Sequence, residues 1–217
     1  MGDISSTATA AAPKQHKWIK HYSDFHKILL VGEGDFSFAL SLATAFGSAS
    51  NIVATSLDSQ VEVIAKYSRA ERNLKELKEK GCTIIHQVDV HTMNKHPLLL
   101  LATFDRIVFN FPHASLIWRE HDLLQIGLHQ EFVRGFMRNA REMLSVRGEV
   151  HVTHKDAYPF CNWEIERLAE AVGLHNFIGK EGFEMWQYPG YQNKRGYGRY
   201  DESFPVGRCS TFKFAPY

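Results

Sequence analysis

Two glycines alternate with two acidic residues in one short segment, Val31-Gly32-Glu33-Gly34-Asp35. Glycines at this spacing, between a predicted strand and a predicted helix, let the backbone turn sharply and approach a ligand. A dinucleotide would place its pyrophosphate at the start of the helix, where two carboxylates would repel it. S-adenosylmethionine (SAM) carries an ammonium and a sulfonium and no phosphate, so the segment predicts a SAM site. The alternative is that both acids only stabilise the helix dipole.

Further carboxylates follow the next two predicted strands. Asp58 comes roughly 20 residues after the glycine turn, where a carboxylate would bind ribose hydroxyls. It also precedes a capping-box pattern, Ser59 to Glu62, which leaves a structural role as the alternative. Asp89 would meet the adenine amino group or serve as an ordinary turn residue. The predicted cofactor-binding set is Gly32, Glu33, Gly34, Asp35, Phe36, Ser37, Asp58, Asp89 and Asn110.

The fourth predicted strand ends in Asn110-Phe111-Pro112-His113. This segment resembles the N/D-P-P-Y/F motif of enzymes that methylate planar nitrogens. In that motif an Asn or Asp side chain and a backbone carbonyl bond the base edge, and an aromatic ring stacks on the base. Phe111 replaces the first proline here, and His113 replaces the aromatic residue. The motif favours a planar, nitrogen-bearing substrate; the alternative is a strand end imposed by Pro112.

The segment 186–208 combines basic and aromatic residues. It contains four Lys or Arg residues and only two Asp or Glu residues, and aromatic residues recur between them. Basic groups meet phosphates and aromatic faces stack on splayed bases, so this mixture suits unpaired RNA. Alternatively, the aromatic residues pack on the domain and the charges are solvated. The predicted RNA-binding set is Lys155, Tyr191, Lys194, Arg195, Tyr197 and Arg199.

Predicted strands and helices alternate along most of the chain. Apolar runs predict strands at 27–31, 52–57, 83–88, 104–109 and 149–153, and amphipathic patterns predict helices at 37–46, 59–81, 120–144 and 163–172. Two further strands, at 176–178 and 210–214, are joined by a long loop. This order predicts an α/β, Rossmann-like fold with a mostly parallel seven-stranded sheet and an antiparallel last strand.

The composition is that of one globular domain. The chain of 217 residues has 44% hydrophobic residues and a net charge of +1, so RNA binding would require a local basic patch. Its three cysteines form no CxxC pair, which argues against a zinc site or a disulfide framework. The longest apolar run, 97–102, is too short to span a membrane. We expect a flexible tail with a basic and aromatic lead-in at 1–26, a single domain at 27–217, no metal and a monomer.

Five segments together resemble a known family. They are VGEGDFSF (31–38), ATSLDS (54–59), FDRIVFNFPHA (104–114), GEVHVTHK (148–155) and YPGYQNKRGYG (188–198). They are similar to the eukaryotic large-subunit (25S) rRNA uridine-N3 methyltransferase family, including its plant members. The resemblance implies a class I methyltransferase fold, SAM as cofactor, rRNA of the pre-ribosome as substrate, and a location in the nucleolus of the nucleus. By position, Gly32, Glu33, Gly34 and Asp58 match the family's cofactor motifs, and Asn110 to His113 match its substrate motif.

Methylation of uracil N3 sets a clear chemical requirement. N3 carries a proton between two carbonyls, so the site needs an acceptor for that proton and donors on O2 and O4. His113 is the candidate base, because an imidazole with a pKa of about 6.5 is mostly neutral at pH 7. Asn110 can donate to a carbonyl, and Lys155 would stabilise the developing oxyanion or bind a phosphate. The predicted catalytic set is therefore Asn110, His113 and Lys155.

Three other functions fit parts of the same sequence. A small-molecule SAM-dependent methyltransferase would need a closed lid and an apolar pocket. A non-catalytic RNA-binding protein that kept the fold would bind RNA and leave SAM untouched. An NAD-dependent oxidoreductase is disfavoured by Glu33 and Asp35, and by Ser37, which stands where the third glycine of the dinucleotide pattern would fall.

Overall fold

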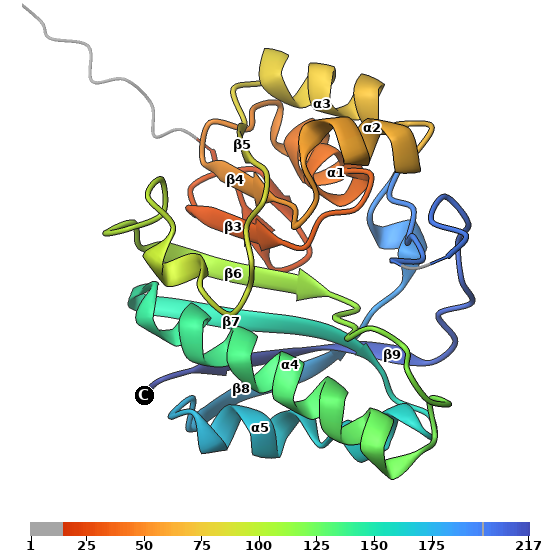
Figure 1. Cartoon of the computed structure of the whole chain (residues 1–217). Helices are drawn as coiled ribbons and strands as arrows, with labels where there is room; N and C mark the ends of the chain where they lie inside the picture. The colour runs from red at the N-terminus through yellow and green to blue at the C-terminus, as the bar shows by residue number, and fades with distance from the viewer. Residues whose placement is uncertain (1–14, 197) are drawn as a thin grey trace, which may run out of the picture.

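A seven-stranded sheet forms the centre of the protein, whose computed structural model describes residues 15–196 and 198–217 (Figure 1). The strands follow the order β5-β4-β3-β6-β7-β9-β8. All neighbouring pairs are parallel except those of β9, which runs antiparallel to both β7 and β8. The predicted fold class is therefore confirmed. The strands are β3 (Ile28–Val31), β4 (Ile52–Thr55), β5 (Thr83–Ile85), β6 (Phe104–Asn110), β7 (Leu144–Lys155), β8 (Asn176–Gly182) and β9 (Cys209–Ala215).

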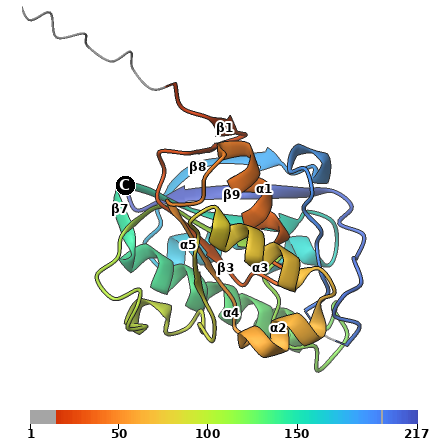
Figure 2. The ribbon, with the colours of Figure 1, turned by 90° about the horizontal axis from the view of Figure 1, so that it is seen from above.

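Helices cover both faces of the sheet (Figures 1 and 2). The helices are α1 (Ser37–Phe46), α2 (Gln60–Lys66), α3 (Ala70–Glu79), α4 (Leu123–Glu142) and α5 (Ile165–Ala171), with short 3-10 turns at Met93–Lys95, Phe160–Trp163 and Met185–Gln187. Alternate residues of β3 supply two separate cores: Leu29 and Val31 pack with α4 and α5, whereas Ile28 and Leu30 pack with α1 and α3. Because a strand turns successive side chains to opposite faces, a strand buried on both faces reads as an uninterrupted apolar run.

The described segment before β3 forms a hairpin that packs on the domain through Tyr22. Strands β1 (Trp18–Ile19) and β2 (Tyr22–Ser23) form a hairpin, and the Tyr22 ring is buried. The Tyr22 hydroxyl donates to Nδ1 of His151 at 3.2 Å, and Lys20 pairs with Glu181 at 2.8 Å. One buried phenol and one ion pair therefore fix this stretch to the sheet. Residues 1–14 of the expected tail lie outside the described residues.

Several predicted elements differ in extent from the structure; for example, β7 begins at Leu144 rather than at residue 149, and β8 continues to Gly182 rather than ending at residue 178. The single helix expected at 59–81 is broken after α2, where Tyr67 takes extended backbone (φ −128°, ψ 114°) and its ring is buried. The capping box from Ser59 to Glu62 is present at the start of α2. The third strand ends at Ile85 rather than at residue 88, because Gln87 adopts a left-handed conformation (φ 60°). Tertiary packing of one aromatic ring thus overrides a continuous helical pattern.

We expect thermal stability to fall as the pH drops from 6.5 towards 4. Burial lowers the pKa of His26 to about 4, and it lowers the pKa values of His21, His129 and His154 to about 3, about 3 and about 4. Below pH 6.5 the unfolded chain binds protons that these buried rings do not take up in the folded state. The effect is therefore absent above pH 6.5 and grows as the pH falls towards the folded values.

The variant His26→Asn isolates one of these rings. Ser23 donates its backbone N–H to Nδ1 of His26 at 3.1 Å, and the amide oxygen of asparagine can accept that bond without titrating. The decline of Tm between pH 6.5 and 4 should be shallower in this variant than in the wild type. His175→Asn, at an exposed position, is the matched control and should keep the wild-type slope. Identical slopes in all three proteins would contradict the assignment.

Candidate active site

A pocket of about 300 Å³ opens beyond the carboxyl ends of β3, β4 and β6. The sheet reverses its order between β3 and β6, and ligands of open α/β sheets bind at such a switch point. The connection between β8 and β9 lies beside the same end of β6 and closes one side of the pocket (Figure 1). The predicted site residues that line it are Gly32, Glu33, Gly34, Asp35, Asp58, Asp89, Asn110, His113, Tyr191 and Lys194.

The glycine turn depends on a close approach at Gly32, whereas a side chain at Gly34 would make ordinary contacts. Gly32 has a left-handed backbone (φ +69°), and a Cβ there would run into the ring of Phe109. A Cβ on Gly34 would lie 3.4 Å from the Tyr67 ring and 3.6 Å from Cβ of Lys194. The absence of both side chains leaves backbone exposed to the pocket, as a tightly bound ligand requires.

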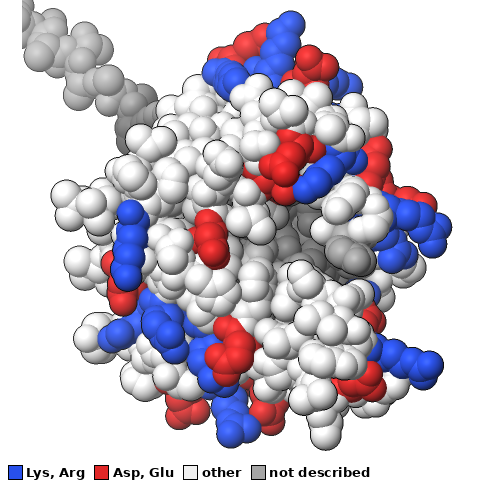
Figure 3. All heavy atoms as spheres, in the orientation of Figure 1, with Lys and Arg blue, Asp and Glu red and all other residues white. Residues whose placement is uncertain are grey.

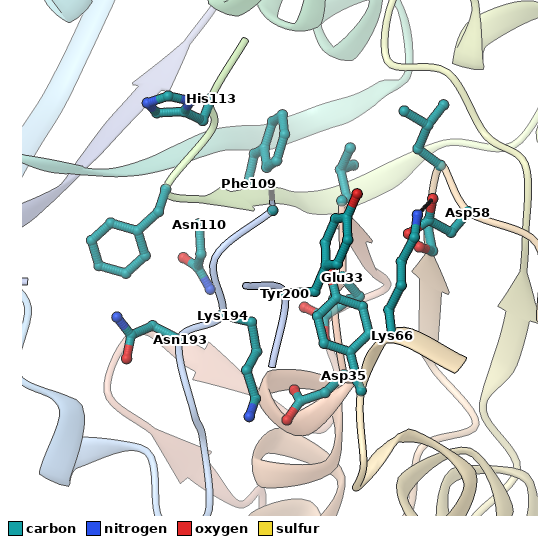
Figure 4. Close-up of a pocket in the computed structure, with 18 of the residues that line it drawn as sticks. Glu33, Asp35, Asp58, Lys66, Phe109, Asn110, His113, Asn193, Lys194 and Tyr200 are labelled. Atoms are coloured by element: carbon teal, nitrogen blue, oxygen red, sulfur yellow. Dashed lines mark hydrogen bonds and ion pairs between the residues drawn. The ribbon is translucent and has the colours of Figure 1, made fainter. Parts of the chain in front are cut away.

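The two acids of the turn have different surroundings. Glu33 turns back onto α1, where its carboxylate accepts the backbone N–H of Ala39 at 3.2 Å, and burial raises its pKa to about 8. Asp35 is buried, and its Oδ1 accepts the backbone N–H of Ser37 at 3.0 Å. Its Oδ2 is buried and has no hydrogen-bond partner among the described residues. Asp35 therefore offers the pocket an acceptor that a ligand cation can use (Figure 4).

Two residues of the predicted cofactor set do not line the pocket. Phe36 is fully buried beside His86, with ring centroids 5.6 Å apart. Ser37 is buried as well: its hydroxyl donates to the carbonyl of Gln192 at 3.3 Å and accepts the backbone N–H of Gln192 at 2.9 Å. Both residues lie behind the turn, because the left-handed backbone of Phe36 (φ 61°) directs the chain into α1 there. Ser37 instead fixes the β8–β9 connection to this helix.

Asp58 does line the pocket, but it has a partner that the sequence did not reveal. Nζ of Lys66, in the last turn of α2, lies 2.6 Å from its carboxylate, and the same ammonium lies 5.0 Å from the centre of the Tyr200 ring. A ribose bound by Asp58 would have to share this carboxylate with Lys66. Asp89 also lines the pocket, and its Oδ1 accepts the backbone N–H of His91 at 2.8 Å, a bond typical of a turn.

The segment that follows β6 lines the part of the pocket away from the glycine turn. Phe111 has a left-handed backbone (φ 51°), a strained conformation of the kind that clusters at functional sites. Oδ1 of Asn110 is buried and, across the described ranges, lacks a hydrogen-bond partner. Nδ1 of His113 donates to the carbonyl of Ala114 at 2.7 Å, so Nε2 is the acceptor of the neutral ring, and it lies 3.8 Å from Oε1 of Glu120. Burial is the main cause that lowers the pKa of His113, which keeps this ring neutral at pH 7.

A buried polar cluster behind His113 fixes this segment. Gln125 accepts the backbone N–H groups of Ile117 and Trp118 at 2.9 and 3.0 Å, and it donates to the carbonyl of Ser115 at 3.0 Å. His129, stacked on Trp163 with centroids 4.1 Å apart, accepts the backbone N–H of Ala114 at 3.1 Å. Neither side chain was predicted to take part in the site, because their bonds to the preceding loop depend on tertiary structure.

The predicted RNA-binding residues divide into buried and exposed groups. The Lys194 side chain is only 8% exposed, and its ammonium lies 2.8 Å from the Asp201 carboxylate. Asp201 also accepts the hydroxyl of Ser68 at 2.6 Å, so this set fixes the loop to the α2–α3 junction. Lys194 is therefore paired within the protein, and the RNA contact that the sequence predicted for it stays a prediction. The ring of Tyr191 packs against Phe38, with centroids 5.2 Å apart, rather than standing free.

The remaining members of that set lie nearer the surface. Arg195 and Arg199 are exposed and lie 3.7 and 3.2 Å from Glu202. Lys155 lies beside the pocket without lining it, with its ammonium 4.5 Å from the Phe160 ring centre and 5.0 Å from that of Phe204. Tyr197 lies outside the described residues.

The residues present fit SAM. Asp35 offers an unused buried acceptor for a cationic group, and Asp58 is a carboxylate at the end of β4, where a ribose would lie. The bare backbone of Gly32 and Gly34 lets a ligand approach closely. Within residues 15–196 and 198–217, no helix could cross a membrane and no group of three or more His, Cys, Asp or Glu could hold a metal ion.

Two solved structures share this architecture. TrmN from Thermus thermophilus matches with a TM-score of 0.54 and 16% identity, over 88% of this chain and 43% of that one. A methyltransferase from Pyrococcus furiosus matches with a TM-score of 0.53 and 16% identity, over 88% of this chain and 75% of that one. The fold is that of the class I SAM-dependent methyltransferases, and the site has the groups that SAM requires.

The family is shown by sequence. The model of the BMT5-like rRNA (uridine-N3-)-methyltransferases matches residues 29–195, and the chain belongs to this family. An uncharacterised Arabidopsis thaliana protein is 55% identical over 91% of this chain and 96% of its own length. Heavy metal-associated isoprenylated plant protein 41 of the same plant is 50% identical over 99% of this chain, which spans 42% of that relative. The 25S rRNA (uridine(2634)-N(3))-methyltransferase of Saccharomyces cerevisiae is 24% identical over 82% of this chain and 68% of its own.

Replacing Asp58 by alanine should weaken SAM binding. Removal of the carboxylate leaves the ribose hydroxyls without an acceptor, a loss of roughly 1–3 kcal/mol. Isothermal titration of SAM into the wild type, Asp58→Ala and the exposed control Glu79→Gln measures the difference. The control should bind like the wild type. Unchanged affinity in Asp58→Ala would show that this carboxylate serves only Lys66.

Proposed function

We propose that this protein methylates N3 of a uridine in large-subunit rRNA, with SAM as the methyl donor. The observation that carries the proposal is the buried, unpartnered Oδ1 of Asn110 beside the His113 ring, both of which line the pocket. Membership of the BMT5-like family supports the choice of uridine N3 and of rRNA. It also supports a place of action on pre-ribosomes in the nucleolus.

The chemistry assigns a separate task to each side chain. SAM supplies an electrophilic methyl group when bound. Uracil N3 becomes nucleophilic as its proton leaves, and Nε2 of the neutral His113 ring can accept that proton. The Asn110 amide, held at the end of β6, positions the base edge through its oxygen or its N–H groups. The buried cluster around Gln125 and His129 keeps the His113 segment in place, so orientation is fixed before the substrate arrives.

RNA would be held by local rather than overall charge. On the face drawn in Figure 3, Lys and Arg lie interspersed with Asp and Glu. Arg199 keeps 79% of its side chain exposed and Arg195 keeps 44%, so both can exchange Glu202 for a phosphate. Exposed surface ion pairs are weak, which makes this exchange cheap in free energy. Arg195 and Arg199 thus replace Lys194 as the preferred phosphate contacts.

Loss of Asn110 or His113 should abolish most methyl transfer without loss of the cofactor. We expect Asn110→Ala and His113→Gln each to reduce turnover by about 10²–10⁴-fold on unmodified 25S rRNA transcripts. SAM affinity, measured by titration, should stay within a few fold. The assay is mass spectrometry of nucleosides for 3-methyluridine. Wild-type rates in both variants would show that the Asn110–His113 segment only ends the strand and has no role in methyl transfer.

The pH dependence offers an independent check on His113. Its neutral form is the acceptor, and its pKa lies below the usual 6.5 because the ring is buried. Turnover should therefore stay constant from pH 8 down to 6.5 and decline only at lower pH. His113→Gln should lack this acidic decline over the range in which the fold persists. A wild-type decline centred above pH 6.5 would contradict the assignment.

The variant Arg195→Ala/Arg199→Ala should bind RNA more weakly and with less salt dependence. Loss of two phosphate contacts on single-stranded RNA should reduce the slope of log K against log salt by about 1.4. The matched control is Arg72→Ala/Arg167→Ala, which removes two exposed arginines from α3 and α5. SAM binding should be unchanged in both. An unaltered salt slope in the first variant would place the RNA elsewhere on the surface.

A further inference from the structure

Asn193 was not predicted as a functional residue, yet it lines the pocket from the β8–β9 connection. Its backbone is held on both sides, since Gln192 is bonded to Ser37 and Lys194 is paired with Asp201. Asn193 itself is only 6% exposed. In Figure 4 its amide lies on the same side of the pocket as that of Asn110. Two carboxamides from distant segments thus flank the end of the pocket that Asn110 and His113 line.

The hydrogen bonds of the Asn193 amide are incomplete. Nδ2 donates one hydrogen to the carbonyl of Phe204 at 2.5 Å, which fixes the direction of the amide. Among the described residues this is the one hydrogen bond of the side chain, so its second N–H has no protein acceptor. An amide carries two N–H donors, and leaving one unused in a buried place costs free energy. A ligand with an acceptor at this point would remove the cost.

The nearby groups define what that acceptor can be. Asn110 Oδ1 lacks a donor, and uracil offers one donor, N3–H, between two carbonyl acceptors. A donor from Asn193 completes this pattern at one of the carbonyls. Cytosine would fail the same test if its amino group took that place, because two donors would then face each other. Mismatched buried polar groups are the strongest basis for discrimination between such substrates.

We propose that Asn193 is a specificity-determining residue that donates its free N–H to a carbonyl oxygen, O2 or O4, beside uracil N3. This inference rests on the proposed function. The bond strengthens as N3 loses its proton, because negative charge then spreads onto both carbonyl oxygens. Asn193 thus favours uracil and assists the proton transfer to His113, while Phe204 holds its amide in the required direction.

The test compares three forms of one substrate. Transcripts of 25S rRNA are made with uridine, with 2-thiouridine or with 4-thiouridine, since sulfur is a much weaker hydrogen-bond acceptor than oxygen. Asn193→Ala should lower kcat/KM on the uridine transcript by about 10–100-fold, the range expected for a lost buried partner. On the thio transcript that lacks the contacted carbonyl, the same substitution should cost less than about threefold. Asn193→Asp, which keeps the shape but removes both N–H donors, should follow the same pattern.

A loop-disrupting variant supplies the matched control. Ser37→Ala removes the hydroxyl that fixes Gln192, and it should reduce kcat/KM by one common factor on all three transcripts. An equal loss on all three RNAs in Asn193→Ala and Asn193→Asp, with an active wild type, would overturn the inference and leave the proposed function intact. A wild-type protein that binds SAM but methylates none of the transcripts would overturn both. Melting temperatures and SAM titration of each variant confirm that fold and cofactor site persist.

Discussion

The close packing of Gly32 on Phe109 is the constraint on which the site depends. Val31 and Phe109 are register partners in the parallel pair β3–β6, so the chain must leave β3 directly above the Phe109 ring. A side chain at residue 32 would collide with this ring and push the turn away from β6. The missing Cβ lets the two strand ends stay adjacent and diverge only beyond the sheet. Asp35 and Asn110 consequently face one shared space from two different strands.

The wall opposite this turn comes from a distant part of the chain. Ser37 bonds the backbone of Gln192, and Asp201 joins Lys194 to Ser68 at the α2–α3 junction. These contacts use polar groups that the sequence suggested for the cofactor or for RNA. The same loop therefore forms the pocket wall and places Asn193 inside it. Its exposed cations remain at the rim, where ion pairs with Glu202 are readily exchanged.

The fold could be predicted because its signals are local. Apolar runs marked the parallel strands, and the capping box at Ser59 marked the start of α2 correctly. The placement of Asp58 and Asn110 beside the pocket was also predictable, since topology brings the strand ends together. The pairing of Lys66 with Asp58 and the burial of Lys194 depend on contacts between distant segments, which no spacing in the sequence encodes. The break of the helix at Tyr67 has the same origin.

The insertion of β9 between β7 and β8 has a consequence for the synthesis of the chain. Residues 209–215 supply an interior strand, so β8 has no neighbour in the sheet until they have been made. Until then β7 presents an unpaired edge, and such edges promote association with other chains. The wall that holds Asn193 cannot form either, because its far end is tied to β9. A ribosome-bound intermediate should therefore lack a cofactor pocket, and this domain would complete its folding only after translation has passed its last strand.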